Sequence, residues 1–153
     1  MQNNFLKNKK IILSAGASGI GLATVKLLLS QGAFVYTCDI DKKNINKLKK
    51  NSYFNKKLFI SECDASKEDE VKKFYKEISY KTKKIDGLIN NIGIAGPTSP
   101  LEKIKSDDWE KTIHVNVNSH FYFTKYAIPM IKKSKNGSII NISSTAGIDG
   151  FPN

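Results

Sequence analysis

The chain of 153 residues is 40% hydrophobic and 25% charged, a balance that is typical of a single globular domain. All 25 basic residues are lysine and 14 residues are acidic, so the formal charge is +11. Arginine supplies the bidentate contacts that read bases and grip phosphates, and the chain contains none. We therefore expect a solvated lysine surface that binds polyanions weakly at low salt, and no specific nucleic-acid partner.

The sequence also argues against a membrane partner and a metal site. It contains no apolar stretch of the ~18 residues that cross a bilayer, and its first residues do not form a signal peptide, so we expect a cytoplasmic protein. Cys38 and Cys63 form no C-x-x-C pair, and we expect them to be buried thiols in strands. His114 and His120 do not share a helical face and have no acidic partner at metal-ligand spacing.

Predicted strands and helices alternate along the first half of the chain. Residues 11–13 form a short apolar strand that leads into a glycine-rich turn and then a helix, which ends at Gln31-Gly32. A β-rich run over 34–38 ends at Asp39 and completes a strand–helix–strand unit. A helix rich in lysine and asparagine over about 42–50 then leads to a strand over 58–60.

Two serines mark the expected starts of the next two helices. Ser66, with Asp69 three residues later, predicts a capping box. Ser106 predicts the N-cap of a helix with acidic residues in its first turn, where the helix dipole favours anions. We expect Trp109, which lies at helical spacing from Ile113, to pack in the core.

The last predicted elements include an unusually apolar helix. A strand over 88–89 precedes a proline-containing loop, and a strand over 138–142 ends the pattern. Between them, a helix over about 118–133 carries too many large apolar side chains for one core-facing stripe, so we expect two of its faces to be buried. Pro129 inside this helix predicts a kink or one lost hydrogen bond.

This alternation predicts an α/β fold, a doubly wound, Rossmann-like parallel sheet in three layers (α/β/α). We expect a single domain over residues 1–153 that is truncated after the fifth strand and incomplete at its C-terminus. Ligands of such sheets bind beyond the carboxyl ends of the strands. Polar or glycine positions follow all five strands, at 16–21, Asp39, Asp64, 90–93 and 143–144, which predicts one ligand site along one edge of the sheet.

Residues 14–21, Ser-Ala-Gly-Ala-Ser-Gly-Ile-Gly, lie between a strand and a helix, where glycines let the backbone approach a pyrophosphate. Asp39, at the end of the second strand, is placed to accept hydrogen bonds from an adenosine ribose and to repel a 2′-phosphate, which favours NAD over NADP. The alternatives are that the turn serves only tight packing, that Asp39 caps the next helix, and that Asp64 forms a turn instead of facing adenine.

Together with Asn116 and Ser144, these motifs resemble the short-chain dehydrogenase/reductase family in order and spacing, from about Lys9 to Asn153. Residues 14–21 resemble T-G-x-x-x-G-x-G, with Ala15 in place of the first glycine. Residues 90–93, Asn-Asn-Ile-Gly, are similar to N-N-A-G, with Ile92 in place of alanine. The added methyl group at Ala15 has to be tolerated where a pyrophosphate approaches.

The resemblance implies specific roles. Ser144 matches the serine that hydrogen-bonds the substrate carbonyl, and Asn116 matches the asparagine that kinks its helix and holds a water of the proton relay. The resemblance also implies a nicotinamide cofactor, and the residues expected to bind it are Ser14, Gly16, Ser18, Gly19, Ile20, Gly21, Asp39, Ile40, Asp64, Ala65, Asn91 and Gly93.

The family's catalytic tyrosine lies 13 residues after the serine, which corresponds to position 157, and its lysine lies four residues further on. We expect none of the six tyrosines of the chain to replace it. The resemblance thus implies an NAD-dependent oxidoreductase of secondary alcohols or ketones that is inactive in this form. The alternative is a non-catalytic nucleotide-binding fragment or regulatory subunit. The helix over 118–133 matches one at the family's dimer interface, which implies a homo-oligomer.

Overall fold

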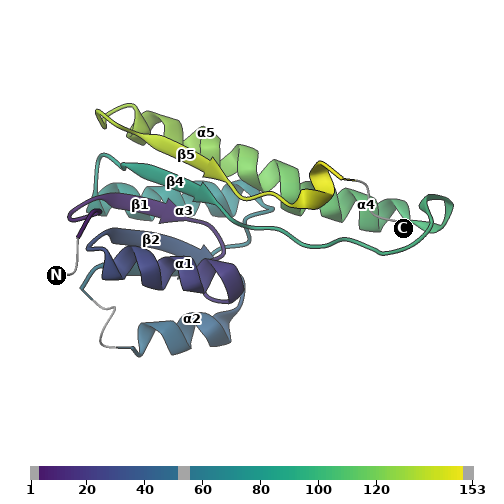
Figure 1. Ribbon diagram of the computed structural model, residues 1–153, viewed down its shortest axis with the longest axis horizontal. Coiled ribbons are helices and arrows are strands. Elements are labelled where there is room, and N and C mark those ends of the chain that lie inside the picture. Colours follow the sequence, from purple (N-terminus) through teal and green to yellow (C-terminus); the bar gives the residue numbers. More distant parts are fainter. Residues whose placement is uncertain (1–3, 52–55, 150–153) are drawn as a thin grey trace.

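The computed structural model describes residues 4–51 and 56–149. Five parallel strands form one sheet in the order β3-β2-β1-β4-β5, with helices on both faces (Figure 1). The predicted doubly wound, three-layer α/β fold is confirmed. The strands are β1 (Lys10–Leu13), β2 (Phe34–Asp39), β3 (Leu58–Glu62), β4 (Gly87–Asn90) and β5 (Ser138–Asn141).

The helices follow the predicted order and have different bounds near the end of the chain. They are α1 (Gly19–Ser30), α2 (Lys42–Lys49), α3 (Glu68–Lys81), α4 (Ser106–Ile113) and α5 (Ser119–Ile131). A π-helical segment, η2 (His114–Asn118), joins α4 to α5, and two single-turn 3-10 helices, η1 (Leu101–Lys103) and η3 (Thr145–Gly147), complete the list. Pro129 lies inside α5, as predicted.

Alternate side chains of β1 build the two halves of the core. Ile12 is fully buried in a cluster with Phe74 of α3 and Phe123 of α5. Its neighbour Leu13 is equally buried on the opposite face, in a cluster with Val25 of α1. This two-residue period places α1 on one face of the sheet and α3 with α5 on the other, so that β1 is covered on both faces.

The strand order reverses direction at β1, and this reversal creates the site. β1 pairs with β2 on one side and with β4 on the other, and Leu13 is level with both Thr37 and Ile89. The chain segments that leave β1 and β4 therefore separate toward opposite faces just beyond Leu13. In open parallel sheets this switch point at the carboxyl edge is where ligands bind.

The expected starts of two helices differ from the structure. Ser66 does not cap α3, because its hydroxyl donates to Asp64 Oδ1 at 2.7 Å and Lys67 takes the N-cap position. Ser106 is the first residue of α4 and Lys105 is its N-cap, so the serine lies one position too late to cap. Asp107 and Asp108 do lie in the first turn of α4, as predicted.

Two apolar surfaces remain open. Trp109 is 56% exposed, contrary to expectation, because α4 projects away from the sheet and has no core beneath it (Figure 1). All four residues of β5 are exposed, and α5 buries one face while Phe121 on another face is 60% exposed. None of the helices in the described part of the chain is long and apolar enough to cross a bilayer.

Candidate cofactor and active site

Two adjoining cavities lie at the carboxyl edge of the sheet. The first has a volume of about 610 Å³ and reaches from the start of α1 to the ends of β2 and β3. The second has a volume of about 700 Å³ and lies between α5 and the segment that follows β5. Residues 91–94, which follow β4, line both cavities, so the two cavities lie side by side and share a wall.

The start of α1 lines the first cavity with backbone groups that no side chain caps. Ser18, Gly19 and Ile20 are exposed there, the Ser18 side chain makes no capping hydrogen bond, and the first turn contains no acidic residue. Gly19 has a φ of +51°, which favours glycine. The open N–H groups and the helix dipole give this end of the cavity the character of an anion site.

Gly21 and Gly16 are required by close packing inside the turn. A Cβ at Gly21 would overlap the carbonyl oxygen of Ala15, and one at Gly16 would overlap Thr37 Oγ1. Gly16 is buried and does not line either cavity. The tight-packing alternative therefore describes Gly16 and Gly21, whereas residues 18–20 are open to the cavity.

Asp39 ends β2 at the wall of the first cavity. Its Oδ2 accepts a hydrogen bond from the Ala17 N–H at 2.9 Å and its Oδ1 accepts one from the Asp41 N–H at 3.1 Å. Asp41, not Asp39, caps α2 by accepting from the N–H groups of Lys43 and Asn44. The alternative that Asp39 only caps the next helix is therefore wrong, and the carboxylate is fixed against the glycine turn.

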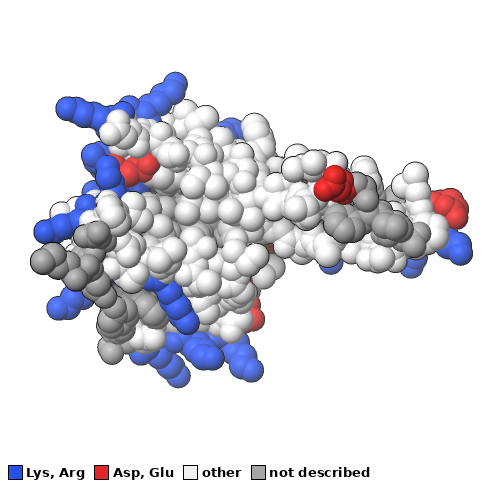
Figure 2. Space-filling view, viewed as in Figure 1, with Lys and Arg blue, Asp and Glu red and all other residues white. Residues whose placement is uncertain are grey.

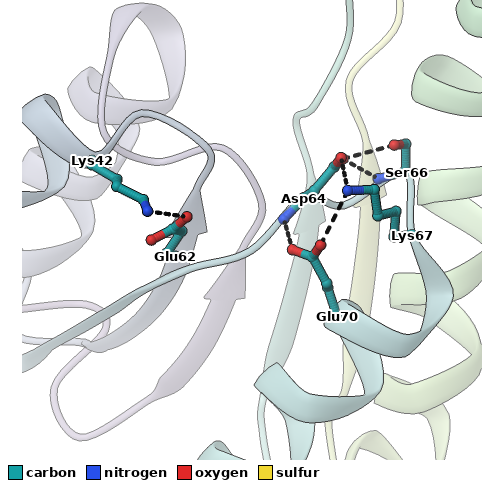
Figure 3. A network of polar contacts seen from close by, with 6 residues as sticks. All are labelled: Lys42, Glu62, Asp64, Ser66, Lys67 and Glu70. Carbon is teal, nitrogen blue, oxygen red and sulfur yellow. Dashed lines mark hydrogen bonds and ion pairs between the residues drawn. The ribbon is translucent and has the colours of Figure 1, made fainter.

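Asp64, beyond the end of β3, belongs to a polar network (Figure 3). Its Oδ1 accepts from the backbone and hydroxyl of Ser66, its N–H donates to Glu70 at 2.7 Å, and Lys67 lies 3.3 Å from Oδ2. Burial opposes ionisation of Asp64, but the hydrogen bonds from Ser66 and Lys67 outweigh it and hold the pKa below its usual value. Asp64 thus forms a turn and also lines the first cavity.

Two buried cysteines form the floor of the first cavity. Cys38 and Cys63 are 1% and 3% exposed, and both are free, buried thiols as predicted. Cys38 lies in β2, whereas Cys63 lies one residue beyond the end of β3 and not in the strand as expected. A hydrogen bond with Cys63 and burial raise the pKa of the Cys38 thiol well above its usual value. The Cys38 thiol therefore stays protonated and unreactive near neutral pH.

Ser14 and Asn91 join the glycine turn to the end of β4. The Ser14 hydroxyl accepts from the N–H groups of Asn91 at 2.9 Å and Ile92 at 3.2 Å. The Asn91 amide donates to the carbonyl oxygens of Ser14 and Ala15, both at 3.1 Å. Ser14 is fully buried and faces the protein interior, whereas Asn91 reaches both cavities.

Asn116 holds the loop after β4 against the helix. It lies in η2, where its Oδ1 accepts from the Ile94 N–H at 2.8 Å and its Nδ2 donates to the Ile94 carbonyl at 2.9 Å. A π-helical segment widens the turn and is often found at functional sites. The side chain also lines the second cavity.

Ser144 lies across the second cavity from Asn116, at the end of the segment that follows β5. Its hydroxyl oxygen accepts from the Ala146 N–H at 3.2 Å and caps η3. His120, one turn after Asn116, lines the same cavity and donates from Nε2 to the Ile92 carbonyl at 3.0 Å. This contact could not be predicted from local pattern, because His120 and Ile92 are 28 residues apart in the chain.

Most predicted site residues meet at these cavities. The residues that line one or both are Ser18, Gly19, Ile20, Gly21, Asp39, Ile40, Asp64, Ala65, Asn91, Gly93, Asn116 and Ser144, whereas Ser14 and Gly16 lie beneath the turn. Lys111 of α4 also lines the first cavity and was not predicted. The described residues contain no cluster of three or more histidine, cysteine, aspartate or glutamate side chains that could hold a metal ion.

The spacing of a tyrosine and a lysine four residues later does occur in the sequence, at Tyr53–Lys57 and Tyr80–Lys84. Tyr80 lies near the end of α3, at the edge of the sheet opposite the cavities, and is 76% exposed. Tyr53 lies outside the described residues. Tyr80 is therefore too far from Ser144 to serve the same site.

Comparison with known proteins gives a consistent result. The family model for short chain dehydrogenase matches residues 9–153. The chain is 35% identical to the 3-oxoacyl-[acyl-carrier-protein] reductase FabG of Thermotoga maritima, with 96% of the chain and 60% of that protein covered. It is 34% identical to the 3beta-hydroxysteroid dehydrogenase of Mediterraneibacter gnavus, with 95% and 53% covered.

Solved structures share the fold. A short chain dehydrogenase from Escherichia coli CFT073, complexed with NADPH, superposes with a TM-score of 0.91 at 22% identity, with 100% of this chain and 65% of that chain covered. The chain spans about three-fifths of the length of the curated relatives it matches. Because the family model matches nearly the whole chain, including the glycine turn and Ser144, the chain belongs to the short-chain dehydrogenase family.

Proposed function

We propose that this chain is the cofactor-binding part of an oxidoreductase that transfers a hydride between a nicotinamide cofactor and a secondary alcohol or ketone. The observation that carries the proposal is that the two cavities are adjacent and share residues 91–94 as a wall. One cavity offers the uncapped start of α1 and the carboxylate of Asp39, and the other offers Asn116 and Ser144. A dinucleotide in the first would present its reactive ring to the second.

The residues of the first cavity fit a dinucleotide. The open N–H groups at the start of α1 suit a pyrophosphate, and the absence of a side chain at Gly19, where a Cβ would meet nothing within 4 Å, leaves room for its approach. The Asp39 carboxylate already accepts two backbone hydrogen bonds and still borders the cavity, where it would accept from ribose hydroxyls. The nicotinamide cofactor, when bound, supplies or accepts the hydride.

The protein residues of the second cavity orient the substrate. The Ser144 hydroxyl would donate to the substrate carbonyl oxygen and so stabilise the negative charge that develops there. The Asn116 side chain makes two hydrogen bonds with the backbone of Ile94 and so fixes the loop that separates the two cavities. The same side chain would order a water for proton transfer. Exchange of the proton itself requires a further acid, for which the resemblance implies a tyrosine downstream of this chain.

NAD preference is the sharpest test of the assigned site, because structural neighbours of the chain contain NADPH or NADP. A fixed carboxylate at Asp39 opposes a 2′-phosphate by charge repulsion. Calorimetric titration of NAD and NADP should show tighter NAD binding, and Asp39→Asn should reduce the ratio of the two affinities by about tenfold or more.

Asp41→Asn is the matched control. Asp41 is the N-cap of α2 and lies two residues after Asp39, so this substitution removes the same charge at a neighbouring position. It should leave the affinity ratio unchanged. Tighter binding of NADP by the unaltered chain, or an equal effect of both substitutions, would remove Asp39 from the ribose site.

The chain by itself should not catalyse the reaction. Mixed with NAD and a range of secondary alcohols, it should bind the cofactor and produce no reduced nicotinamide, measured by absorbance. Alcohol-dependent reduction of NAD would overturn this expectation. Sequencing the gene beyond codon 153 distinguishes the enzyme from the binding-only alternative, which gains if a stop codon follows.

The exposed apolar face of α5 supports a homo-oligomer. Phe121 is 60% exposed and Ile128 is 38% exposed, although both belong to a helix whose opposite face is fully buried. Apolar area of this kind is typical of subunit contacts. Analytical ultracentrifugation of the complete protein should show a dimer or a higher oligomer, and Phe121→Lys should shift it toward the monomer.

A further inference from the structure

The edge of the sheet opposite the cavities carries a concentration of lysine. We define the amino edge as the segments that lead into the strands, from the last residue of each preceding helix to the first residue of the strand. Within the described residues it comprises 4–10, 30–34, 49–51 with 56–58, 81–87 and 131–138. These segments contain 13 of the 25 lysines and one of the 14 acidic residues, Asp86.

The whole net charge of the protein therefore lies at the amino edge. The remaining residues contain 12 lysines and 13 acidic residues and are almost neutral. Asp86 offsets little of the positive electrostatic field of these lysines. Its side chain is only 9% exposed and already accepts hydrogen bonds from the Lys10 N–H and the Ser134 hydroxyl. A compositional excess of lysine alone does not explain this separation, since it would raise the charge of every surface.

Ten of the 13 lysines of the amino edge are exposed, whereas Lys9, Lys10 and Lys57 are half-buried. Figure 2 shows lysine side chains projecting from the end of the molecule at which the strands begin. In the last segment, Lys132, Lys133 and Lys135 are all exposed. A one-signed, exposed cluster of this size produces a field that attracts polyanions from a distance.

Two exposed aromatic rings lie among these lysines. Phe5, before β1, is 79% exposed, and Tyr80, in the last turn of α3, is 76% exposed. α3 packs against one face of the sheet, and the turn that contains Phe5 lies beside the end of α1 on the other. Exposed rings beside cations provide stacking surfaces for unpaired bases.

We propose that the amino edge binds single-stranded nucleic acid without sequence specificity. Lysine meets phosphate as a point charge and needs no fixed geometry, so the absence of arginine is compatible with backbone contacts and excludes only base readout. Lysines that extend from four separate segments suit a flexible chain, which can follow a convex end. A planar bilayer would contact only some of these lysines. An anionic membrane surface is therefore the alternative that the experiment has to distinguish from nucleic acid.

The site is independent of the cofactor. It lies at the amino ends of the strands, and both cavities lie at the carboxyl ends. Saturating NAD should therefore leave the affinity for an oligonucleotide unchanged. If NAD displaces the oligonucleotide, the strand occupies the dinucleotide cavity and the proposal fails, whereas the proposed function would stand.

The experiment measures fluorescence anisotropy of a labelled oligouridine of about 20 nucleotides over a range of salt concentrations. Lys132→Gln/Lys133→Gln/Lys135→Gln should weaken binding by about tenfold and lower the slope of log K against log salt by about two, the value for three lost phosphate contacts to a single strand. Tyr80→Ala should weaken binding by a further several-fold without altering the salt slope.

Lys72→Gln/Lys73→Gln/Lys76→Gln on α3 is the matched control, with the same change of charge at three exposed lysines away from the amino edge. It should reduce affinity by less than twofold. Equal losses from both triple variants would show that binding follows net charge alone and would overturn the proposal. Tighter binding to phosphatidylserine vesicles than to the oligouridine at equal ionic strength would overturn it in favour of a membrane surface.

Discussion

Ala15 adopts a left-handed backbone conformation, with φ at +56°, in the turn between β1 and α1. This conformation brings Cβ of an L-residue close to a backbone oxygen and costs roughly 1–2 kcal/mol. It explains physically why the resembling family pattern has glycine at this position. The chain retains the turn because Asn91 and Asp39 fix the carbonyl and amide groups around it.

Ala15→Gly should stabilise the protein. Relief of the strain exceeds the extra conformational entropy that glycine adds to the unfolded chain, so the free energy of unfolding should rise by about 0.5–1 kcal/mol. Urea denaturation measures the change. Ala23→Gly, at an exposed position inside α1, is the control and should lower the stability by about 1 kcal/mol. A loss of stability at both positions would contradict the assignment of strain to Ala15.

At the scale of elements, α4, η2 and α5 form one interrupted helix whose residues line both cavities. The π-helical segment places Asn116 against the loop after β4, and His120 one turn later donates to the same loop at Ile92. These contacts couple the helix to residues 91–94, which separate the cavities. The geometry of the site therefore depends on this helix as much as on the strand ends.

Asn116→Ala should release the loop at Ile94. The substitution removes two hydrogen bonds, of 2.8 and 2.9 Å, which together contribute about 1–3 kcal/mol. Hydrogen exchange should show faster exchange of the Ile94 amide with little change in the core strands. Asn118→Ala, in the same segment, should leave that amide as it was. Unchanged protection of Ile94 in the Asn116 variant would show that the loop is held by other contacts.

At the scale of the whole molecule, Asp86 joins the beginnings of several elements. It accepts from the Lys10 N–H at 2.9 Å and the Ser134 hydroxyl at 2.7 Å, and Lys9 and Lys84 lie 3.9 Å away. Burial opposes ionisation of Asp86, but these hydrogen bonds and cations outweigh it, so its pKa lies below the usual value. The ionised carboxylate therefore stabilises the folded state.

The pH dependence follows from the sign of that shift. The stabilisation by Asp86 is complete above the pKa of the unfolded carboxyl, near 3.9, and is lost as the pH falls through the lower pKa of the folded state. Asp86→Asn should lower the free energy of unfolding by about 1–2 kcal/mol at neutral pH, and the difference should shrink below about pH 4. Denaturation at several pH values measures it.

Glu102→Gln removes an exposed negative charge and should have little effect at any of these pH values. A difference between Asp86→Asn and the unaltered chain that stays constant down to acidic pH would point to lost packing instead of lost charge.

Prediction from sequence succeeded where the periodicity of apolar side chains and the glycines at the ends of elements were sufficient to define strands and helices. The alternation of strands and helices, the free buried thiols Cys38 and Cys63, and the meeting of Asp39 and Ser144 at one edge follow from local pattern and parallel connection. Prediction failed at Ser66 because its hydroxyl bonds Asp64 instead of the helix end, and at Ser106 because α4 begins at this residue and not after it. It failed at Trp109 because helical spacing does not reveal whether another element lies opposite.

The sequence by itself determined which strand ends carry polar and glycine residues, because the end of each apolar run can be recognised from the residues next to it. Only the tertiary structure decided that Ser14, 77 residues before Asn91, faces that residue instead of a ligand, and that His120 reaches Ile92. It also decided that lysines from separate segments share one end of the molecule. The physical reason is that local patterns specify a residue's element and face, whereas strand order and register set the distances between residues far apart in the chain.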